Sequence, residues 1–261
     1  MSRFFAQLEY RGSNYHGFQK QLNTKKTIQH HLEKALSKVA NEPVKIICSG
    51  RTDAGVHATN QIIHFDTTSQ RNTDSWTKGT NRYLPDDISV IKIHKVKNDQ
   101  HARFDAIKRT YKYLLKKSNN NVGLENEQCL LFKENLNAER MNRASQYLVG
   151  EKDFSSFRAS GCQSSSAIRE IFEVSVKIKG PYIIFSITGN AFLLNMVRII
   201  VGTLIEVGSN ELSLKEFKDI IAAKKRSRAG KTVSPNGLYF IGPEYNDFQY
   251  KKNTVLIDEL D

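Results

Sequence analysis

The amino-acid sequence predicts an α+β protein built from two similar lobes packed side by side. Short strands and amphipathic helices are mixed along the chain, and the clearest pair of strands is joined by a tight turn, as in antiparallel sheets. The order of elements in the first half also resembles that in the second, although the halves share no obvious sequence. We therefore expect an N-terminal lobe over residues 1–105 and a C-terminal lobe over residues 106–261.

The first lobe is expected to begin with a strand in the apolar segment Phe4–Tyr10. A helix over Thr27–Ala40 follows, because apolar residues recur there every three to four positions and a proline comes shortly after its end. A polar segment around Trp76 is expected to be helical. Three further strands are expected at Val44–Cys48, Gln61–Phe65 and Ile88–Val96. Since Val44–Cys48 carries apolar residues on both faces, it is expected inside the sheet.

The second lobe is expected to open with the strand Tyr111–Leu115 and a helix over Asn137–Leu148. A hairpin comes next: apolar and polar residues alternate through Phe172–Ile178, Gly180-Pro181 supplies a turn, and Ile183–Ile187 repeats the alternation. This pattern predicts an antiparallel strand pair.

Two helices and a strand complete the second lobe. Apolar residues over Leu193–Ile205 follow the i, i+3, i+4, i+7 spacing of one helix face, and Gly208 ends the helix. Ser213 and Glu216 have the spacing of a capping box, which predicts the start of another helix. A final strand is expected at Leu238–Ile241.

The charge balance favours a polyanionic partner. The chain has 39 Lys+Arg against 27 Asp+Glu, a net charge of +12, and basic residues that neutralise phosphates release condensed counterions. A lysine-rich proteome would produce the same excess, so charge alone leaves both explanations open.

The three cysteines form no CxxC pair, which fits a reducing cytoplasm. The N-terminus lacks a signal-peptide core, and polar residues interrupt the longest apolar stretch, so no membrane association is expected.

The segment Gly50–Ala58, GRTDAGVHA, lies between two apolar strands and carries a carboxylate close to an arginine. Its two glycines suit a tight loop at a sheet edge, which would hold Asp53 outward. A carboxylate near Arg51 stays ionised at neutral pH, as a nucleophile must. For an isolated RTDAG, however, a structural turn in which Asp53 caps its own backbone is the commoner arrangement.

GRTDAGVHA resembles the signature of the tRNA pseudouridine synthase A family. Six further blocks resemble that family's motifs, in the same order and over nearly the whole chain. These blocks are Tyr15–Gln19 with Thr27–Gln29, His101–Phe104, Lys108–Tyr113, Asp153–Phe157 with Gly161–Cys162, Asn190–Arg198 and Thr232–Leu238. The sequence departs from the family pattern at Val233-Ser234, where Ala-Pro is usual, and at Asn60, where Gly is common.

This resemblance implies the pseudouridine synthase fold, with an extended, mainly antiparallel mixed sheet flanked by helices. It implies isomerisation of uridine to pseudouridine at positions 38–40 of the tRNA anticodon stem-loop, by a cytoplasmic homodimer that needs no cofactor. The N-terminal lobe would carry the Asp53 loop, and the C-terminal lobe would complete the active site and the RNA cleft. No metal site is expected either, because His30 and His31 point apart on a helix and His57 and His64 lack a third ligand at useful spacing.

The resemblance also implies roles for individual residues. Asp53 would be the nucleophile and would attack either ribose C1′ or uracil C6, a choice that the sequence leaves open. Tyr111 would stack on the uracil and help remove its C5 proton, Arg198 would pair with Asp53, and Arg51 would hold the flipped nucleotide. The remaining implied contacts are Leu238 with the substrate, and His101, Arg103, Phe104, Arg158, Cys162 and Gln163 with RNA.

The competing interpretation is a non-catalytic RNA-binding protein of the same fold. The joint presence of Asp53, Tyr111 and Arg198 favours an enzyme, because a chain that had lost its activity would be expected to have lost one of them. The position of Arg198 is informative on its own. It lies at the edge of the apolar face of its helix, where a guanidinium either is paired or extends to solvent.

Overall fold

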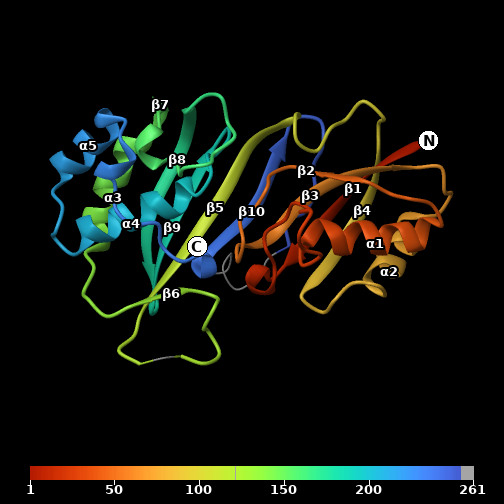
Figure 1. The fold of residues 1–261 in the computed structure, drawn as a ribbon, viewed down its shortest axis with the longest axis horizontal. Helices are drawn as coiled ribbons and strands as arrows, with labels where there is room; N and C mark the ends of the chain where they lie inside the picture. Colours follow the sequence, from red (N-terminus) through yellow and green to blue (C-terminus); the bar gives the residue numbers. More distant parts are fainter. Residues whose placement is uncertain (121, 254–261) are drawn as a thin grey trace. The chain divides into compact units, whose positions relative to one another are not determined.

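The computed structural model describes residues 1–120 and 122–253 of the 261-residue chain. These residues form two compact units. Among the described residues, the first comprises 1–109 and 239–253, and the second comprises 110–120 and 122–238. Each unit combines strands with helices (Figure 1), which confirms the predicted α+β class.

In the first unit the strands lie in the order β4–β1–β3–β10, and β2 also pairs with β3. The pairs β1–β3, β1–β4 and β2–β3 are antiparallel, whereas β10 runs parallel to β3. The helices α1 and α2 pack against each other, and α2 packs against β4. The elements are β1 (Ser2–Tyr10), α1 (Ile28–Ala40), β2 (Ile46–Cys48), β3 (His57–Thr67), α2 (Thr73–Asn81), β4 (Ile88–Val96) and β10 (Leu238–Tyr245, whose first residue belongs to the second unit), with a 3₁₀ turn at Gly12–Asn14.

Local signals explain where α1 starts and stops. The Thr27 side chain accepts a hydrogen bond from the His30 amide, which satisfies one of the amides that a helix start leaves without an internal partner. Asn41 then takes the left-handed conformation, with φ of 57°, and ends the helix. The predicted helix is therefore confirmed.

The expectation that Val44–Cys48 lies inside the sheet is wrong. The observed strand β2 is shorter, covers Ile46–Cys48 and lies off the main path of the sheet, paired with β3. Its middle residue Ile47 is 44% exposed. One face of this short strand therefore meets solvent in spite of its apolar composition.

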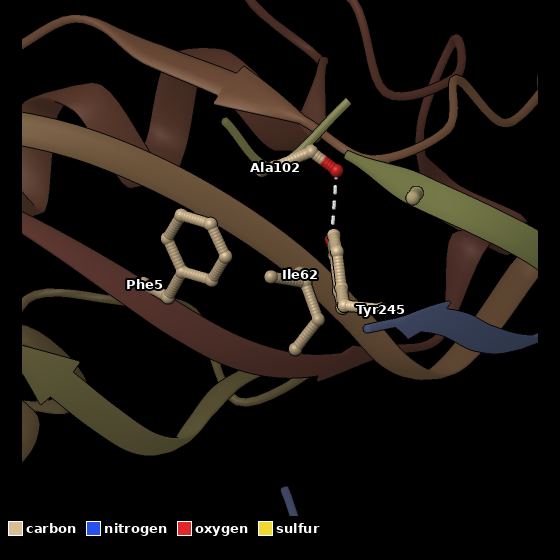
Figure 2. Packing of buried hydrophobic residues seen from close by; sticks show 5 residues of the cluster. Phe5, Ile62, Ala102 and Tyr245 are labelled. Atoms are coloured by element: carbon tan, nitrogen blue, oxygen red, sulfur yellow. Dashed lines mark hydrogen bonds between the residues drawn. The ribbon is translucent and has the colours of Figure 1, made fainter. Parts of the chain in front are cut away.

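A cluster of buried residues in the first unit holds the segment between β4 and β5 in place. Phe5, Ile62, Ala102 and Tyr245 pack together, as Figure 2 shows. The Tyr245 hydroxyl donates a hydrogen bond of 2.7 Å to the Ala102 carbonyl. Because Ala102 belongs to one of the family-like motifs, this motif is anchored directly in the core.

In the second unit the strands lie in the order β5–β9–β8–β7, and β6 runs parallel to β5. Helix α3 packs against β8 and α4, and α5 packs against both α3 and α4. The elements are β5 (Ala106–Lys117, whose first four residues belong to the first unit), β6 (Leu130–Phe132), α3 (Ala138–Ser145), β7 (Gly150–Asp153), β8 (Ile168–Lys179), β9 (Tyr182–Gly189), α4 (Met196–Gly208) and α5 (Leu214–Ala223). Short 3₁₀ turns lie at Gln146–Leu148, Ser155–Phe157, Arg226–Arg228 and Pro235–Gly237.

The hairpin and the capping box are confirmed. Lys179 faces Tyr182 across the turn, and Gly180 has a φ of +54°. Ser213 and Glu216 exchange both hydrogen bonds of the capping box. Helix α4, by contrast, starts at Met196 and not at Leu193, because Asn195 takes a left-handed conformation with φ of 59°.

Candidate active site

Asp53 lies in the loop that joins β2 to β3. The Val56 amide donates a 3.2 Å hydrogen bond to the Asp53 carbonyl, and Gly55 has a φ of +80°, so Asp53 opens a tight turn that needs a glycine at its third position. The Asp53 side chain is half-buried, while Arg51 in the same loop is exposed. The loop thus presents both side chains at its surface, where they can meet a ligand.

The segment YHGFQ (Tyr15–Gln19) supports this loop through backbone hydrogen bonds. The Phe18 amide donates to the Thr52 carbonyl at 3.0 Å, and the Gly55 amide donates to the Tyr15 carbonyl at 3.2 Å. At Gly17, φ is +90°, and an added Cβ would lie 2.8 Å from the Thr52 carbonyl oxygen. The glycine of this motif is therefore required by the close approach of two backbones.

The end of β1 supports the loop as well. The hydroxyls of Tyr10 and Thr52 share a buried hydrogen bond of 2.8 Å, and the Gly12 amide donates to His57 Nδ1 at 3.1 Å. A Cβ on Gly12 would lie 2.0 Å from the Val56 carbonyl oxygen. Burial raises the pKa of Tyr10, so its hydroxyl remains protonated.

The start of the loop is fixed by β3. The Ser49 amide donates to the Ile62 carbonyl at 2.8 Å, and the Ser49 hydroxyl donates to Gln61 Oε1 at 2.7 Å. Gln61 Nε2 in turn donates to the Gly50 carbonyl at 2.6 Å. Both ends of the Asp53 loop are thus held by hydrogen bonds, which restrict the positions that the carboxylate can take.

The turn between β4 and β5 contains the half-buried His101 and the exposed Arg103 and Phe104. The His101 Nδ1 atom accepts hydrogen bonds from the amides of Arg103 at 3.1 Å and Phe104 at 3.0 Å. The rings of His101 and Phe104 stack with centroids 4.2 Å apart, and the Arg103 guanidinium lies 5.7 Å from the Phe104 ring centroid. Phe104 is 75% exposed. An exposed aromatic ring beside a cation suits the stacking of a nucleobase.

The protonation of two histidines matters for this turn. The Ala102 amide donates to His64 Nδ1 at 3.1 Å, which requires an unprotonated nitrogen there. Burial, together with the charges of Arg3 and His101, lowers the pKa of His64 to about 4. Burial also lowers the pKa of His101, although Asp105 opposes the shift. At neutral pH, Arg103 therefore supplies the positive charge of this turn.

The two tyrosines of the KRTYKY motif, Tyr111 and Tyr113, have different surroundings on β5. Tyr113 is fully buried, and its hydroxyl donates to the Ser234 carbonyl at 2.6 Å. Tyr111 is 7% exposed and meets the half-buried Phe192 edge-on, with ring centroids 5.1 Å apart. Tyr113 is thus a core residue, whereas Tyr111 borders a partly exposed aromatic ring.

Arg198 is half-buried on α4 and fixes the segment that follows α5. Its Nε donates to the Val233 carbonyl at 2.7 Å, and its Nη1 donates to Asn195 Oδ1 at 2.8 Å. The guanidinium is therefore paired, as its place at the edge of an apolar face requires. The Val233 carbonyl accepts from Arg198 and the Ser234 carbonyl accepts from Tyr113. Because both acceptors are backbone atoms, the departure from Ala-Pro at these two positions leaves these hydrogen bonds intact. Leu238, at the start of β10, is 4% exposed.

The loop before β8 contains the other residues predicted to touch RNA. Arg158 Nη2 donates to the carbonyls of Cys162 at 3.0 Å and Ser164 at 2.5 Å, so this arginine shapes the loop. Cys162 is half-buried and Gln163 is exposed. The candidate residues are thus divided between the units: Arg51, Asp53 and the turn 101–104 belong to the first, and Tyr111, Arg158–Gln163, Arg198 and Leu238 belong to the second.

Over residues 1–120 and 122–253, the structure contains no group of three or more His, Cys, Asp or Glu side chains that could hold a metal ion. Within the same ranges, no helix is both long enough and apolar enough to cross a membrane.

Comparisons with known proteins agree with the motifs. A family model described as tRNA pseudouridine synthase matches residues 6–105 and 144–246. The proteins named tRNA pseudouridine synthase A of Francisella philomiragia subsp. philomiragia and of Francisella tularensis subsp. novicida are each 42% identical to this chain over 255 residues, which is 98% of this chain and of the relative. A chain of a solved Cbf5-Nop10-Gar1 complex is 11% identical, with a TM-score of 0.33, in a match that covers 91% of this chain and 58% of that one.

Proposed function

This chain belongs to the tRNA pseudouridine synthase family, and we propose that it acts on the anticodon stem-loop of tRNA, at uridines 38–40, with Asp53 as the nucleophile. The match to named tRNA pseudouridine synthases over nearly the full chain makes it an isomerase that converts uridine in tRNA to pseudouridine. The observation that carries the assignment to Asp53 is the supported loop, which holds a half-buried carboxylate near the exposed Arg51.

The reaction breaks the bond between uracil N1 and ribose C1′ and forms a bond between C5 and C1′. A proton leaves C5 and a proton is gained at N1, so no oxidant or reductant is required. In the proposed mechanism the Asp53 carboxylate attacks C1′ or C6, holds the intermediate covalently while the uracil turns, and is released when the new bond forms. A loop held at both ends suits this chemistry, because the nucleophile must remain aligned through two bond changes.

We assign supporting roles to residues of both units. Tyr111 stacks on the uracil and assists removal of the C5 proton, Arg198 completes the active site, and Arg51 holds the nucleotide that has been turned out of the stack. Leu238 borders the uracil. The RNA strand is bound by His101, Arg103, Phe104, Arg158, Cys162 and Gln163. The exposed Phe104 ring and the neighbouring Arg103 guanidinium support this assignment for the turn 101–104.

The direct test is Asp53→Asn, which removes the nucleophile but hardly changes the volume of the side chain. We expect D53N to make no pseudouridine while its affinity for tRNA stays within about threefold of the wild-type value. Release of tritium from C5 of labelled uridine measures turnover, and a filter assay measures binding. Asp74→Asn, which changes an exposed aspartate in the first turn of α2, is the matched control and should retain full activity.

Substantial turnover by purified D53N would overturn the role of Asp53. A wild-type protein that binds tRNA without forming pseudouridine would instead favour the non-catalytic RNA-binding alternative. Mapping pseudouridines in tRNA from cells with and without the gene tests the assignment to positions 38–40. The target position is contradicted if another uridine alone loses its modification.

We further propose that the enzyme works as a homodimer in the cytoplasm. A tRNA arm is long compared with one active site, so a second subunit can position the stem while the first presents Asp53. The cysteine usage of the chain fits a reducing compartment. Light scattering at micromolar protein should give a mass near twice 29.8 kDa. A fully active monomer at that concentration would refute the two-subunit arrangement and leave the role of Asp53 untouched.

A further inference from the structure

We propose that Arg109 is a positioning residue that couples the RNA-contacting turn His101–Phe104 to the base of the Asp53 loop. RNA that binds at the turn then helps to fix the carboxylate in the position required for attack. This inference rests on the proposed function of Asp53. It assigns to Arg109 a positioning role that is distinct from binding RNA and from taking part in the reaction.

The guanidinium of Arg109 donates hydrogen bonds to three backbone carbonyls within the first unit. Its Nε donates to the Ser49 carbonyl at 3.0 Å, and its Nη2 donates to the Arg103 carbonyl at 2.7 Å. Its Nη1 donates to the Ala106 carbonyl at 3.1 Å, at the start of β5. Ser49 is the residue from which the Asp53 loop departs, and Arg103 lies in the middle of the exposed turn. One planar group therefore joins the two segments.

Each of these segments is also held by hydrogen bonds to β3 or β10. The base of the loop is fixed by Gln61, which bonds both the Ser49 hydroxyl and the Gly50 carbonyl. The turn is fixed by His64 and Tyr245, which bond the amide and the carbonyl of Ala102. Because these anchors leave each segment little freedom, the guanidinium holds the turn and the base of the loop at a defined separation.

The electrostatics of the loop base agree with this arrangement. Burial raises the pKa of the Cys48 thiol to about 11, and the positive charges of Arg51, Arg103 and Arg109 oppose that shift. The three guanidinium groups are therefore gathered around the residue that precedes Ser49. Arg51 and Arg103 are exposed and can meet phosphate, whereas Arg109 is half-buried and directs its donors to backbone carbonyls.

An arginine is required for such a link. Its guanidinium presents N–H donors in a fixed plane, so one side chain can hold several carbonyls at defined angles. The lysine ammonium is a compact charge at the end of a flexible stem and cannot span the same three acceptors. Replacement of Arg109 by lysine therefore keeps the charge and loses the link.

The test compares Arg109→Met and Arg109→Lys with the neighbouring Lys108→Met, which also removes one positive charge from β5. Lys108 lies 3.9 Å from Glu244, a pair in which both side chains are over 40% exposed. With tRNA in saturating excess, we expect the single-turnover rate of pseudouridine formation to fall about 10- to 100-fold in R109M and R109K. The dissociation constant for tRNA should change less than about threefold, and K108M should keep the wild-type rate.

Two further measurements separate positioning from a general structural effect. Millimolar methylguanidinium should restore part of the rate of Arg109→Ala, while sodium chloride at equal concentration should not. Phe104→Ala should lower the saturated rate in the wild-type background but have little further effect in R109M, because the link is already lost. Circular dichroism and thermal unfolding confirm that each variant is folded, and R109K replaces R109M if the latter is not.

A wild-type rate in R109M or R109K at saturating tRNA would overturn the proposal, and so would equal losses in R109M and K108M. Independent, additive effects of F104A and R109M would also contradict the coupling. A failure of the proposed function looks different, because wild-type protein would then lack turnover or D53N would retain it, whatever Arg109 does.

Discussion

At the scale of single residues, Gly17 shows how a motif far from Asp53 in sequence acts on the Asp53 loop. Its φ of +90° is one that residues with a side chain rarely adopt, and the Thr52 carbonyl occupies the space that a Cβ would need. Both constraints act at the same position. The glycine lets the YHGFQ segment lie against the loop so closely that their backbones exchange hydrogen bonds.

Gly17→Ala should therefore displace the loop. We expect a loss of stability of at least about 1 kcal/mol from the backbone conformation alone, and a fall in the saturated rate of about 10- to 100-fold from the misplaced nucleophile. Gly180→Ala is the matched control, because Gly180 also has a positive φ but open space around it. G180A should lose stability and keep its rate. Equal rates in G17A and G180A would show that the close contact does not matter for catalysis.

Residue identity was easier to predict from the sequence than residue environment. The GRTDAGVHA segment indicated a tight loop between two strands, and the structure has such a loop between β2 and β3, with Asp53 half-buried in it. The same segment gave no sign that Tyr10, Gly12 and Gly17 support it, because these contacts join segments about forty residues apart. The glycine of YHGFQ was the one available signal. The role of Asp53 itself stays a prediction until D53N is measured.

At the scale of elements, the link between β3 and the turn 101–104 depends on a neutral histidine. His64, on β3, accepts the Ala102 amide, and its pKa of about 4 lies below the ordinary value for histidine. The unfolded chain binds a proton near pH 6.5, whereas the folded chain does not until the pH approaches 4. The stability associated with neutral His64 is therefore complete above about pH 6.5 and is lost progressively as the pH falls towards 4.

His64→Gln should flatten this part of the pH dependence. The glutamine oxygen can still accept the Ala102 amide, but it does not titrate in this range. Thermal unfolding of both proteins between pH 7 and pH 4.5 measures the difference, since all other titrating groups are shared. We expect the wild-type melting temperature to fall more steeply than that of H64Q. Parallel curves would show that His64 is not the group responsible.

Elements were predicted well where the signal is local. Helix α1, the hairpin β8–β9 and the start of α5 depend on caps, turns and periodicity that lie within a few residues, and all three are confirmed. The short strands β6 and β7 were missed, because three or four residues such as Gly150–Asp153 carry no alternation to detect. The pairing of β10 with β3 was also hidden: it joins Tyr239 to His57, and no local pattern reports a parallel partner so distant in sequence.

At the scale of the whole molecule, the excess of positive charge fits a polyanionic substrate such as tRNA. The net charge of +12 costs stability through self-repulsion unless a polyanion compensates for it. In the proposed interface, exposed groups such as Arg51 and Arg103 meet phosphates, while Phe104 offers a ring to a base. The first kind of contact releases counterions and the second does not, so the two can be separated by salt.

Affinity for tRNA should therefore fall steeply as salt rises. Each phosphate contact contributes about 0.7 to 0.9 to the slope of log affinity against log salt, so about five contacts give a slope of roughly −4. The measurement uses D53N, which cannot turn over, titrated with tRNA between about 50 and 200 mM salt. Adding Arg103→Gln should reduce the magnitude of the slope by about one unit, whereas adding Phe104→Ala should weaken binding at every salt concentration and leave the slope unchanged. A nearly flat response would mean that the positive charge is not the binding surface. A change of slope in F104A equal to that in R103Q would mean that the turn 101–104 does not divide its contacts between phosphate and base as proposed.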